Sequence, residues 1–356
     1  MKILIDIGHP AHVHYFRNFI KTMETKGHKF LIIARDKEVT FNLLKAFNIP
    51  YISRGKGGKG FGGKLLYLFK GDYIIYKEAK KFKPDILLSF ASVYAAQVSK
   101  ILRKPHIAFN DTEHALLGHL LYFPFTDVVL TPSSFFKNLG SKQIKFDGFM
   151  ELCHLHPNYF IPNENILTEI GVEKGEKFTL LRFVSWEASH DFGKARLNTE
   201  FKIKLFNSLL KYGKVIISAE GQLPSELEKH RVRISPEKMH DILSYASLYI
   251  GEGATTASEC AMLGTPSVYV NVLDAGTLQE QNNFGLLFNF RNDSGVIEKA
   301  IELISNNKIK KDFQIRRMKM LSEKIDVTSF MIWFVENYPK SFSVMKENPH
   351  YQDHFK

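Results

Sequence analysis

Short apolar segments alternate with amphipathic segments along nearly the whole chain. In the first half the apolar segments are residues 2–7, 30–34, 50–53, 86–90, 106–110, 127–130 and 144–146. In the second half they are residues 178–183, 215–218, 231–234, 248–250 and 267–270. A regular strand–helix repeat favours parallel strands joined by crossover helices. The sequence therefore predicts an α/β fold of two Rossmann-like, doubly wound parallel-sheet domains that face a cleft.

The boundary between the two predicted domains falls at residues 154–165 (HLHPNYFIPNEN), which are rich in turn formers and lack hydrophobic periodicity. A chain of 356 residues is also long for a single core. We expect an N-terminal domain over residues 1–153, this linker, and a C-terminal domain over residues 166–328. Within residues 329–356 we expect a helix at 329–337 that crosses back to the first domain, then a polar, mobile tail from Ser341.

The composition is that of a globular protein in a reducing compartment, with 44% hydrophobic and 24% charged residues. Cys153 and Cys260 are the only cysteines, which excludes a disulfide scaffold and a cysteine-based zinc site. The N-terminus leads directly into a strand and no apolar run reaches 18 residues. We therefore expect no signal peptide, no membrane span and a cytoplasmic location.

The positive charge lies in the first half of the chain. Residues 1–150 hold 23 Lys and Arg against 11 Asp and Glu, a net charge of +12, and the remainder has a net charge of −1. This excess favours an anionic partner, although a generally basic proteome gives the same bias. The basic, glycine-rich segment 54–64, expected to be a mobile loop, and the apolar segment 116–123 favour peripheral docking at the inner face of an anionic membrane. No nucleic-acid partner is expected, because an aromatic–basic RNA motif is missing.

Residues 250–283 have the pattern of a phosphate-binding turn followed by a helix. Glycines at 251 and 253 precede a predicted helix whose first residues are Ala254, Thr255 and Thr256. A helix N-terminus offers unpaired N–H groups and partial positive charge, and Gly253 would let a diphosphate approach the backbone. Glu259 lies about one turn further on, where a carboxylate suits the hydroxyls of ribose. The alternative is an ordinary βα turn in which a threonine only caps the helix.

Other polar loops also follow predicted strands, at residues 8–14, 54–64, 89–94, 110–114, 184–193, 219–222 and 251–256. The carboxyl ends of strands in facing doubly wound domains border a cleft, so we expect these loops to converge. Ser185 is expected to contribute to phosphate or sugar recognition, and Glu220 to meet the base or ribose. Gln279 and Gln281 are expected to bind sugar hydroxyls.

The loop at residues 8–14 (GHPAHVH) contains three histidines. Metal binding is one interpretation, but no acidic or cysteine partner has metal-like spacing, and we predict no metal site. Helix capping and packing account for some of these side chains. A histidine at this turn also suits a general base, and we choose His12, with His9 and His14 as alternatives. Glu113 is the second catalytic candidate, because it has no evident structural duty in the loop DTEH.

Three missing motifs narrow the function. GxxxxGK[ST] is absent, which argues against a P-loop enzyme, and no GxGxxG follows the first strand, which argues against NAD binding. No DxD-like pair ends a strand, so a metal-chelated sugar nucleotide is not indicated.

Several motifs together resemble GT-B glycosyltransferases, in particular the lipid-linked UDP-N-acetylglucosamine transferase of peptidoglycan synthesis. The matching stretches are Gly8 with His12-Val13, Arg54-Gly55-Lys56-Gly57, Pro84-Asp85, Gly253-Ala254 with Thr256 and Glu259, Leu263-Gly264-Thr265-Pro266, and more loosely Gln279-Glu280-Gln281-Asn282. The resemblance implies that Glu259 holds the ribose. It also implies that His12 is a base or an acceptor-site group.

The chain is also similar to non-hydrolysing UDP-N-acetylglucosamine 2-epimerases, where Glu113 matches an active-site glutamate. Those enzymes carry a catalytic aspartate after the fourth strand, whereas this chain has SFAS at residues 89–92. Their His-Arg-x-Glu-Asn loop is replaced by residues 185–191. The chain further resembles a microbial family with GHPAHVH and FVSWEASHD motifs.

These features predict a metal-independent glycosyltransferase that moves a sugar from a UDP-sugar to an acceptor hydroxyl. The donor is a substrate, and we expect no separate cofactor. A lipid-linked sugar or a cell-surface glycan would serve as acceptor. The alternatives are a UDP-HexNAc 2-epimerase and a catalytically inert binder of sugar nucleotides or polyanions.

Overall fold

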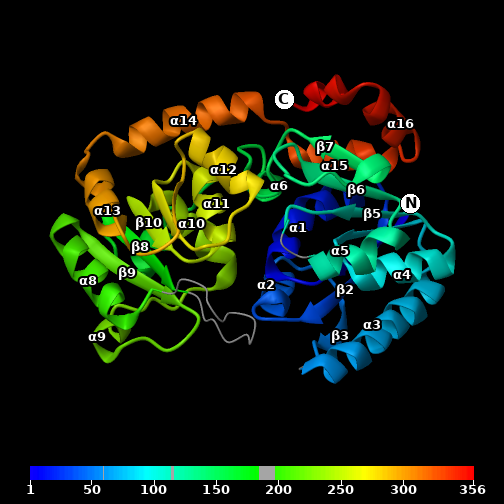
Figure 1. The fold of residues 1–356 in the computed structure, drawn as a ribbon, viewed down its shortest axis with the longest axis horizontal. Coiled ribbons are helices and arrows are strands. Elements are labelled where there is room, and N and C mark those ends of the chain that lie inside the picture. The colour runs from blue at the N-terminus through cyan, green and yellow to red at the C-terminus, as the bar shows by residue number, and fades with distance from the viewer. Residues whose placement is uncertain (59, 114–115, 184–196) are drawn as a thin grey trace. The chain divides into compact units, whose positions relative to one another are not determined.

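The computed structural model describes residues 1–58, 60–113, 116–183 and 197–356 (Figure 1). The chain divides into two compact units. The N-terminal unit comprises residues 1–159 and 324–356, and the C-terminal unit comprises residues 160–323. Each unit has its own parallel sheet covered by helices, so the predicted α/β fold class is confirmed.

In its described residues the N-terminal unit forms a seven-stranded sheet of order β3-β2-β1-β4-β5-β6-β7, parallel throughout. The strands are β1 (Lys2–Ile7), β2 (Lys29–Asp36), β3 (Ile52–Lys56), β4 (Ile86–Phe90), β5 (His106–Phe109), β6 (Val128–Pro132) and β7 (Gln143–Phe146). The strand order reverses between β1 and β4, where Asp6 pairs in register with Ser89. Ligands of doubly wound sheets bind beyond the carboxyl ends at such a switch point.

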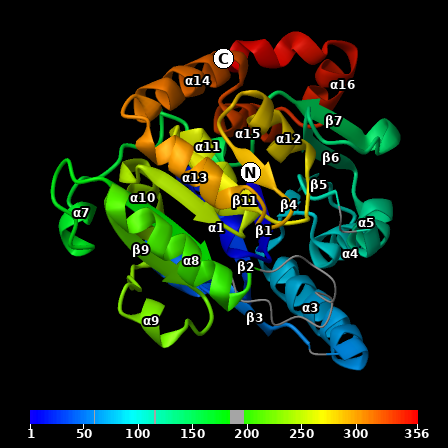
Figure 2. The same ribbon diagram turned by 60° about the vertical axis from the view of Figure 1, so that its left-hand side comes forward.

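Helices connect most of these strands, and a short helix follows the last one. They are α1 (Pro10–Thr25), α2 (Thr40–Ala46), α3 (Gly60–Phe82), α4 (Val93–Leu102), α5 (Leu116–Tyr122) and α6 (Leu152–Leu155). The buried residues of α1 include Val13, Phe16, Ile20 and Met23, which recur at helical spacing and so form one core-facing stripe. Helix α3 packs beside α4 and against β3, and its long axis can be followed in Figure 2.

The C-terminal segment of the chain packs onto the N-terminal unit through α15 (Val327–Glu336) and α16 (Lys340–Glu347). The Phe330 ring lies 5.9 Å from that of Phe146, and Thr328 Oγ1 donates a 2.9 Å hydrogen bond to the Cys153 carbonyl. The expectation of a mobile tail from Ser341 is wrong. The tail forms α16 and a 3-10 helix (Pro349–Phe355), because Tyr351 stacks on Trp333 at 4.6 Å.

Within its described residues the C-terminal unit has a parallel sheet of order β12-β11-β10-β8-β9. Its strands are β8 (Phe178–Phe183), β9 (Lys214–Ala219), β10 (Leu248–Gly251), β11 (Ser267–Val270) and β12 (Phe288–Phe290). Its helices are α7 (Ile166–Glu169), α8 (Thr199–Leu209), α9 (Ser225–Glu228), α10 (Met239–Tyr245), α11 (Ala254–Leu263), α12 (Gly276–Asn283), α13 (Val296–Ser305) and α14 (Ile309–Glu323).

Two local predictions are wrong. Residues 231–234 form no strand and make only an isolated bridge between Ile217 and Arg231. The Arg231 guanidinium donates to the carbonyls of Ala219 and Gly221, which holds this segment as a loop. The segment 54–64 is not one loop, since β3 continues to Lys56 and α3 begins at Gly60. No helix in the described parts of the chain is both long and apolar enough to cross a membrane.

Candidate functional site

The turn between β10 and α11 leaves the first amides of a ten-residue helix without a side-chain cap. The N-cap is Gly253, at φ −95° and ψ 119°, and glycine has no side chain that could accept from those amides. Ala254 and Thr255 are partly exposed, whereas Thr256 is buried. The first turn of α11 contains no acidic residue to offset its partial positive charge. This helix N-terminus therefore suits an anionic ligand.

Gly251, just before this turn, is required for packing between strands. A Cβ atom at this position would lie 2.2 Å from Tyr249 Oη and 2.9 Å from the Arg182 carbonyl oxygen. Burial raises the pKa of Tyr249 well above its usual value, so its hydroxyl stays protonated. Packing inside the sheet thus explains why this position is glycine. The sequence motif suggests a different reason, which is room for a phosphate beside the backbone.

Glu259 on α11 is held by a histidine that sequence reasoning missed. Its Oε1 lies 2.9 Å from Nε2 of His240 on α10, and both side chains are buried. A carboxylate has about four acceptor positions, so this contact fixes its orientation without using up its capacity. His240 stands 19 residues upstream on another helix, and no local pattern in the sequence marks it.

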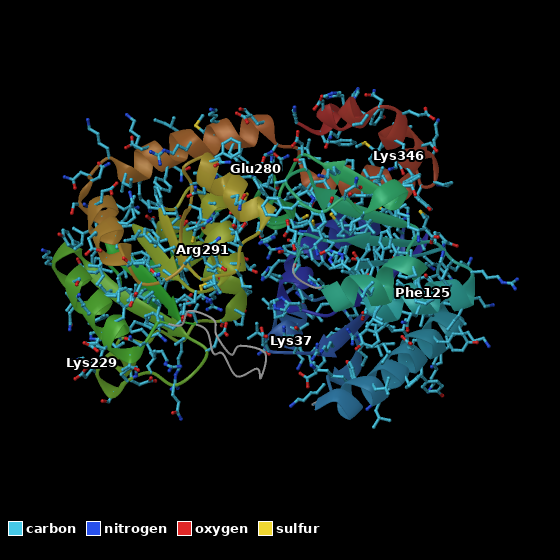
Figure 3. All side chains as sticks on the ribbon, viewed as in Figure 1. Lys37, Phe125, Lys229, Glu280, Arg291 and Lys346 are labelled. Atoms are coloured by element: carbon cyan, nitrogen blue, oxygen red, sulfur yellow. The ribbon has the colours of Figure 1, made fainter. Side chains whose placement is uncertain are left out.

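The two glutamines expected to bind the sugar have different surroundings. Gln281 is fully buried, and its Nε2 donates a 2.6 Å bond to Ser258 Oγ, which ties α12 to α11. It is therefore a packing residue here, and its amide does not face solvent. Gln279 is exposed and bonds Asp274 Oδ2 at 2.5 Å. Figure 3 labels Glu280, which lies between them on α12.

Arg182 adds a cation at the same edge of the sheet. It lies on β8, in register with Gly251 of β10, and its guanidinium bonds Ser218 Oγ and Glu220 Oε1, each at 2.9 Å. The exposed Glu220, predicted to meet the base or ribose, is thus paired with Arg182. The signal in the sequence was a single arginine in an apolar strand (FTLLRF). Ser185, in the following loop, lies outside the described residues.

The N-terminal unit holds a buried ion pair at its switch point. Arg54 Nε lies 2.8 Å from Asp6 Oδ1, and both side chains are almost fully buried. Arg54 Nη1 also donates to Tyr67 Oη at 2.7 Å, and Ser92 Oγ donates to Asp6 Oδ2 at 2.5 Å. The segment at residues 89–92, which ends β4 and follows it, contains no carboxylate, and its Ser92 donates instead to the carboxylate of Asp6 on β1. An aspartate inside an apolar strand is a sign of a buried charge, but the sequence does not mark its partner, which lies 48 residues away.

A second carboxylate lies near this ion pair. Burial, and after it the charge of Asp6, raise the pKa of Asp72 on α3 to about 7, although Arg54 opposes the shift. Asp72 Oδ1 is buried and has no hydrogen-bond partner in the described part of the chain. Sequence reasoning missed this residue because its neighbours are distant in sequence.

The three histidines of residues 8–14 have different surroundings. His9 caps α1 by accepting from the Ala11 amide at 3.3 Å, and burial and Lys37 lower its pKa to about 4. His12 Nδ1 accepts from the Gly8 amide at 3.3 Å, which places its proton on Nε2. Buried His14 packs on the His154 ring at 5.0 Å. The side chain of Lys37, after β2, is labelled in Figure 3.

His12 is neutral at physiological pH. Burial, followed by the charges of His9, Lys37 and Arg54, holds its pKa well below the usual value of 6.5. Its ring also lies 4.8 Å from that of Phe90 at the end of β4.

Glu113 has a structural contact that the sequence did not suggest. It is buried, and its Oε1 accepts a 3.3 Å bond from the Phe136 amide. Its neighbour Asp111 is partly exposed, and burial raises the pKa of Asp111 to about 6.

The two doubly wound parallel sheets define a GT-B fold, which solved structures share across nearly the whole chain. A UDP-GlcNAc 2-epimerase from Neisseria meningitidis bound to UDP-GlcNAc superposes with a TM-score of 0.66 at 13% identity, covering 88% of this chain and 94% of that chain. A glycosyltransferase of Streptomyces sp. SF2575 gives a TM-score of 0.59 at 12% identity, covering 95% and 100%.

The chain belongs to the family described as "Protein of unknown function (DUF354)", whose profile matches residues 1–339. An uncharacterised protein of Methanocaldococcus jannaschii is 25% identical over 281 residues, 75% of this chain and 81% of that protein. The UDP-N-acetylglucosamine–N-acetylmuramyl-(pentapeptide) pyrophosphoryl-undecaprenol N-acetylglucosamine transferase of Thermosipho africanus is 26% identical over 212 residues. This alignment covers 58% of the chain and 57% of the transferase.

Proposed function

We propose that this protein is a metal-independent glycosyltransferase that moves a sugar from a UDP-sugar to an acceptor hydroxyl. The observation that carries the proposal is the glycine-capped N-terminus of α11 with the buried Glu259 about one turn beyond it. The similarity to a transferase that uses UDP-N-acetylglucosamine, and to an epimerase bound to UDP-GlcNAc, supports UDP as the nucleotide.

In this proposal the donor binds to the C-terminal unit. The diphosphate accepts hydrogen bonds from the first amides of α11, and Glu259 accepts from the ribose hydroxyls. As the sugar–phosphate bond breaks, negative charge grows on the diphosphate. Fixed amides stabilise that charge without reorganisation, and Arg182 supplies a further positive charge at the same sheet edge.

His12 is the proposed base for the acceptor hydroxyl. Its low pKa leaves the ring deprotonated but makes it a weak base. An acceptor that carries phosphate, such as a lipid-linked sugar, would offset the charges of Lys37 and Arg54 and so raise the pKa of His12. Nδ1 of His12 accepts a long hydrogen bond from the Gly8 amide, and the acceptor hydroxyl would have to take the place of that amide. A His12→Asn variant should lose transfer by about 100-fold or more with UDP affinity unchanged.

A ligand panel tests the donor assignment directly. The thermal stability of the protein is measured with UDP, GDP, CMP and ADP, since a ligand of the folded state raises the melting temperature. We expect UDP to stabilise most, and Glu259→Ala to weaken UDP binding by about tenfold. Glu298→Ala, an exposed substitution on α13, is the matched control. Equal UDP affinity in Glu259→Ala and the control overturns the site.

A UDP-HexNAc 2-epimerase is the second candidate. It is favoured by the TM-score of 0.66 against the epimerase, which exceeds the 0.59 against the glycosyltransferase. Asp111, with a pKa of about 6, is a carboxyl group suited to proton transfer at the end of β5. Incorporation of deuterium at sugar C2 from D2O, with no acceptor present, identifies the epimerase. Transfer to an acceptor without such exchange identifies the transferase. UDP binding without either reaction identifies an inert binder.

A further inference from the structure

The outward face of α3 is apolar over its first turns. Four large side chains are strongly exposed: Leu65 (47%), Leu66 (74%), Phe69 (66%) and Tyr73 (63%). They recur three and four residues apart, so they form one stripe along the helix, about 12 Å long. The opposite face carries Tyr67, Ile75 and Ala79 into the core. A surface helix normally presents polar residues to water, so this stripe indicates a partner.

The charges of α3 define which partner fits. Exposed Lys70 and Lys77 each lie four residues beyond a member of the stripe and extend the same face. The helix has five lysines and two acidic residues, Asp72 and Glu78. Asp72 faces the Asp6–Arg54 pair, and Glu78 is bound to Lys81 at 2.9 Å, so each acidic residue has a partner other than Lys70 and Lys77.

Apolar side chains beside lysines match the boundary of an anionic bilayer. Leucine and phenylalanine enter the acyl region, tyrosine remains at the headgroups, and lysine stems extend outward to the phosphates. A second copy of this chain fits poorly, because it would bring two lysine-rich faces together. The neighbouring helices add further exposed apolar side chains, with Ile101 on α4 and Leu120 on α5. Helices α3, α4 and α5 pack in sequence along the N-terminal unit (Figure 1).

We propose that the stripe Leu65, Leu66, Phe69 and Tyr73 is a membrane-docking surface that inserts among the headgroups of an anionic lipid leaflet. Lys70 and Lys77 hold it there by contact with lipid phosphates. The docking does not depend on the chemistry of the C-terminal unit. Together with the proposed transfer reaction, it would bring the N-terminal unit to a lipid-linked acceptor.

Vesicle sedimentation of the full chain tests the surface. Vesicles of phosphatidylglycerol and phosphatidylethanolamine are compared with vesicles of phosphatidylcholine alone. We expect binding to the anionic vesicles that weakens with salt. The double variant Leu66→Ser/Phe69→Ser should reduce the partition coefficient by about tenfold or more, and Lys70→Glu/Lys77→Glu should do so at low salt. Both variants change exposed side chains, so folding is preserved, which an unchanged melting temperature verifies.

The matched control is Ile161→Ser/Met318→Ser, which removes exposed apolar side chains of the C-terminal unit (87% and 68% exposed) and should leave binding unchanged. Absence of binding to anionic vesicles overturns the proposal, and so does an equal loss in the control. A dimer seen by light scattering that disappears in Leu66→Ser/Phe69→Ser would assign the stripe to self-association instead. UDP binding is measured separately, so failure here is distinguishable from failure of the donor site.

Discussion

His240 Nε2 lies 2.9 Å from Glu259 Oε1, and both side chains are buried between α10 and α11. The pair joins two helices that are connected through β10, and it helps to orient the carboxylate. A buried polar group is costly when unbonded, so such a contact also restricts the rotamers of Glu259.

The first prediction concerns this pair. His240→Phe keeps an aromatic ring but removes the hydrogen bond, and UDP affinity should fall about five- to tenfold because the carboxylate loses its orientation. His240→Gln retains a donor and should bind UDP more tightly than His240→Phe. Titration calorimetry measures both. Equal affinities of the two variants would show that His240 does not position Glu259.

The second prediction concerns the contact at Gly251. Gly251→Ala places a Cβ 2.2 Å from Tyr249 Oη and 2.9 Å from the Arg182 carbonyl oxygen, so the buried Tyr249 ring must move, and the free energy of unfolding should fall by about 1–3 kcal/mol. Gly62→Ala is the control, because nothing lies within 4 Å of its Cβ position. Denaturant unfolding of both variants measures the difference, and similar midpoints would contradict the steric explanation.

The third prediction concerns the buried Asp6–Arg54 pair. Arg54→Met leaves the Asp6 carboxylate buried without its guanidinium partner and should lower the free energy of unfolding by about 3–5 kcal/mol. Asp6→Leu combined with Arg54→Met should recover part of that loss, since no charge then remains. A double-mutant cycle measures the coupling. Additive effects of the two substitutions would mean that the pair contributes nothing as a pair.

The fourth prediction concerns pH. The pKa of Asp72 is raised from 3.8 to about 7, so between these values the folded protein retains a proton that the unfolded chain releases. Stability therefore falls as pH rises from about 4 to 7, and the loss is complete above pH 7. Asp72→Asn should raise stability at pH 8 by roughly 1 kcal/mol after allowance for partial exposure, and change little below pH 4. Melting temperatures of the two proteins across pH 4 to 8.5 measure this, and a lower value for the variant at pH 8 contradicts it.

Much of the fold could be predicted from the sequence because each strand of a buried parallel sheet is a short apolar run. Residues 2–7 and 178–183 were predicted as strands and are β1 and β8 with the same bounds. The short edge strand β12 was missed, and the strand predicted at residues 231–234 was wrong. The difference at 231–234 comes from hydrogen bonds between the Arg231 side chain and a distant backbone, which local periodicity does not contain.

In the candidate site, too, local features could be predicted from the sequence and contacts between distant residues could not. The α11 turn and Glu259 could be identified because their spacing is local. His240 and the Asp6–Arg54 pair could not, because each contact joins residues separated by 19 or more positions. Glu113 and Gln281 were predicted as site residues from local position, but the structure gives each a contact within the protein. Glu113 accepts from the Phe136 amide, and Gln281 donates to Ser258. The catalytic roles of His12 and Glu113 remain predictions.

The placement of α15 and α16 has a consequence for how the protein is synthesised. The N-terminal unit takes its last two helices from residues that follow the entire C-terminal unit. Domains generally fold as units during synthesis, so the C-terminal unit can complete its contacts first. Until residues 324–356 emerge, the surface around Phe146 and Cys153 lacks its aromatic cover. The unit of the protein that is made first is therefore the unit that finishes last.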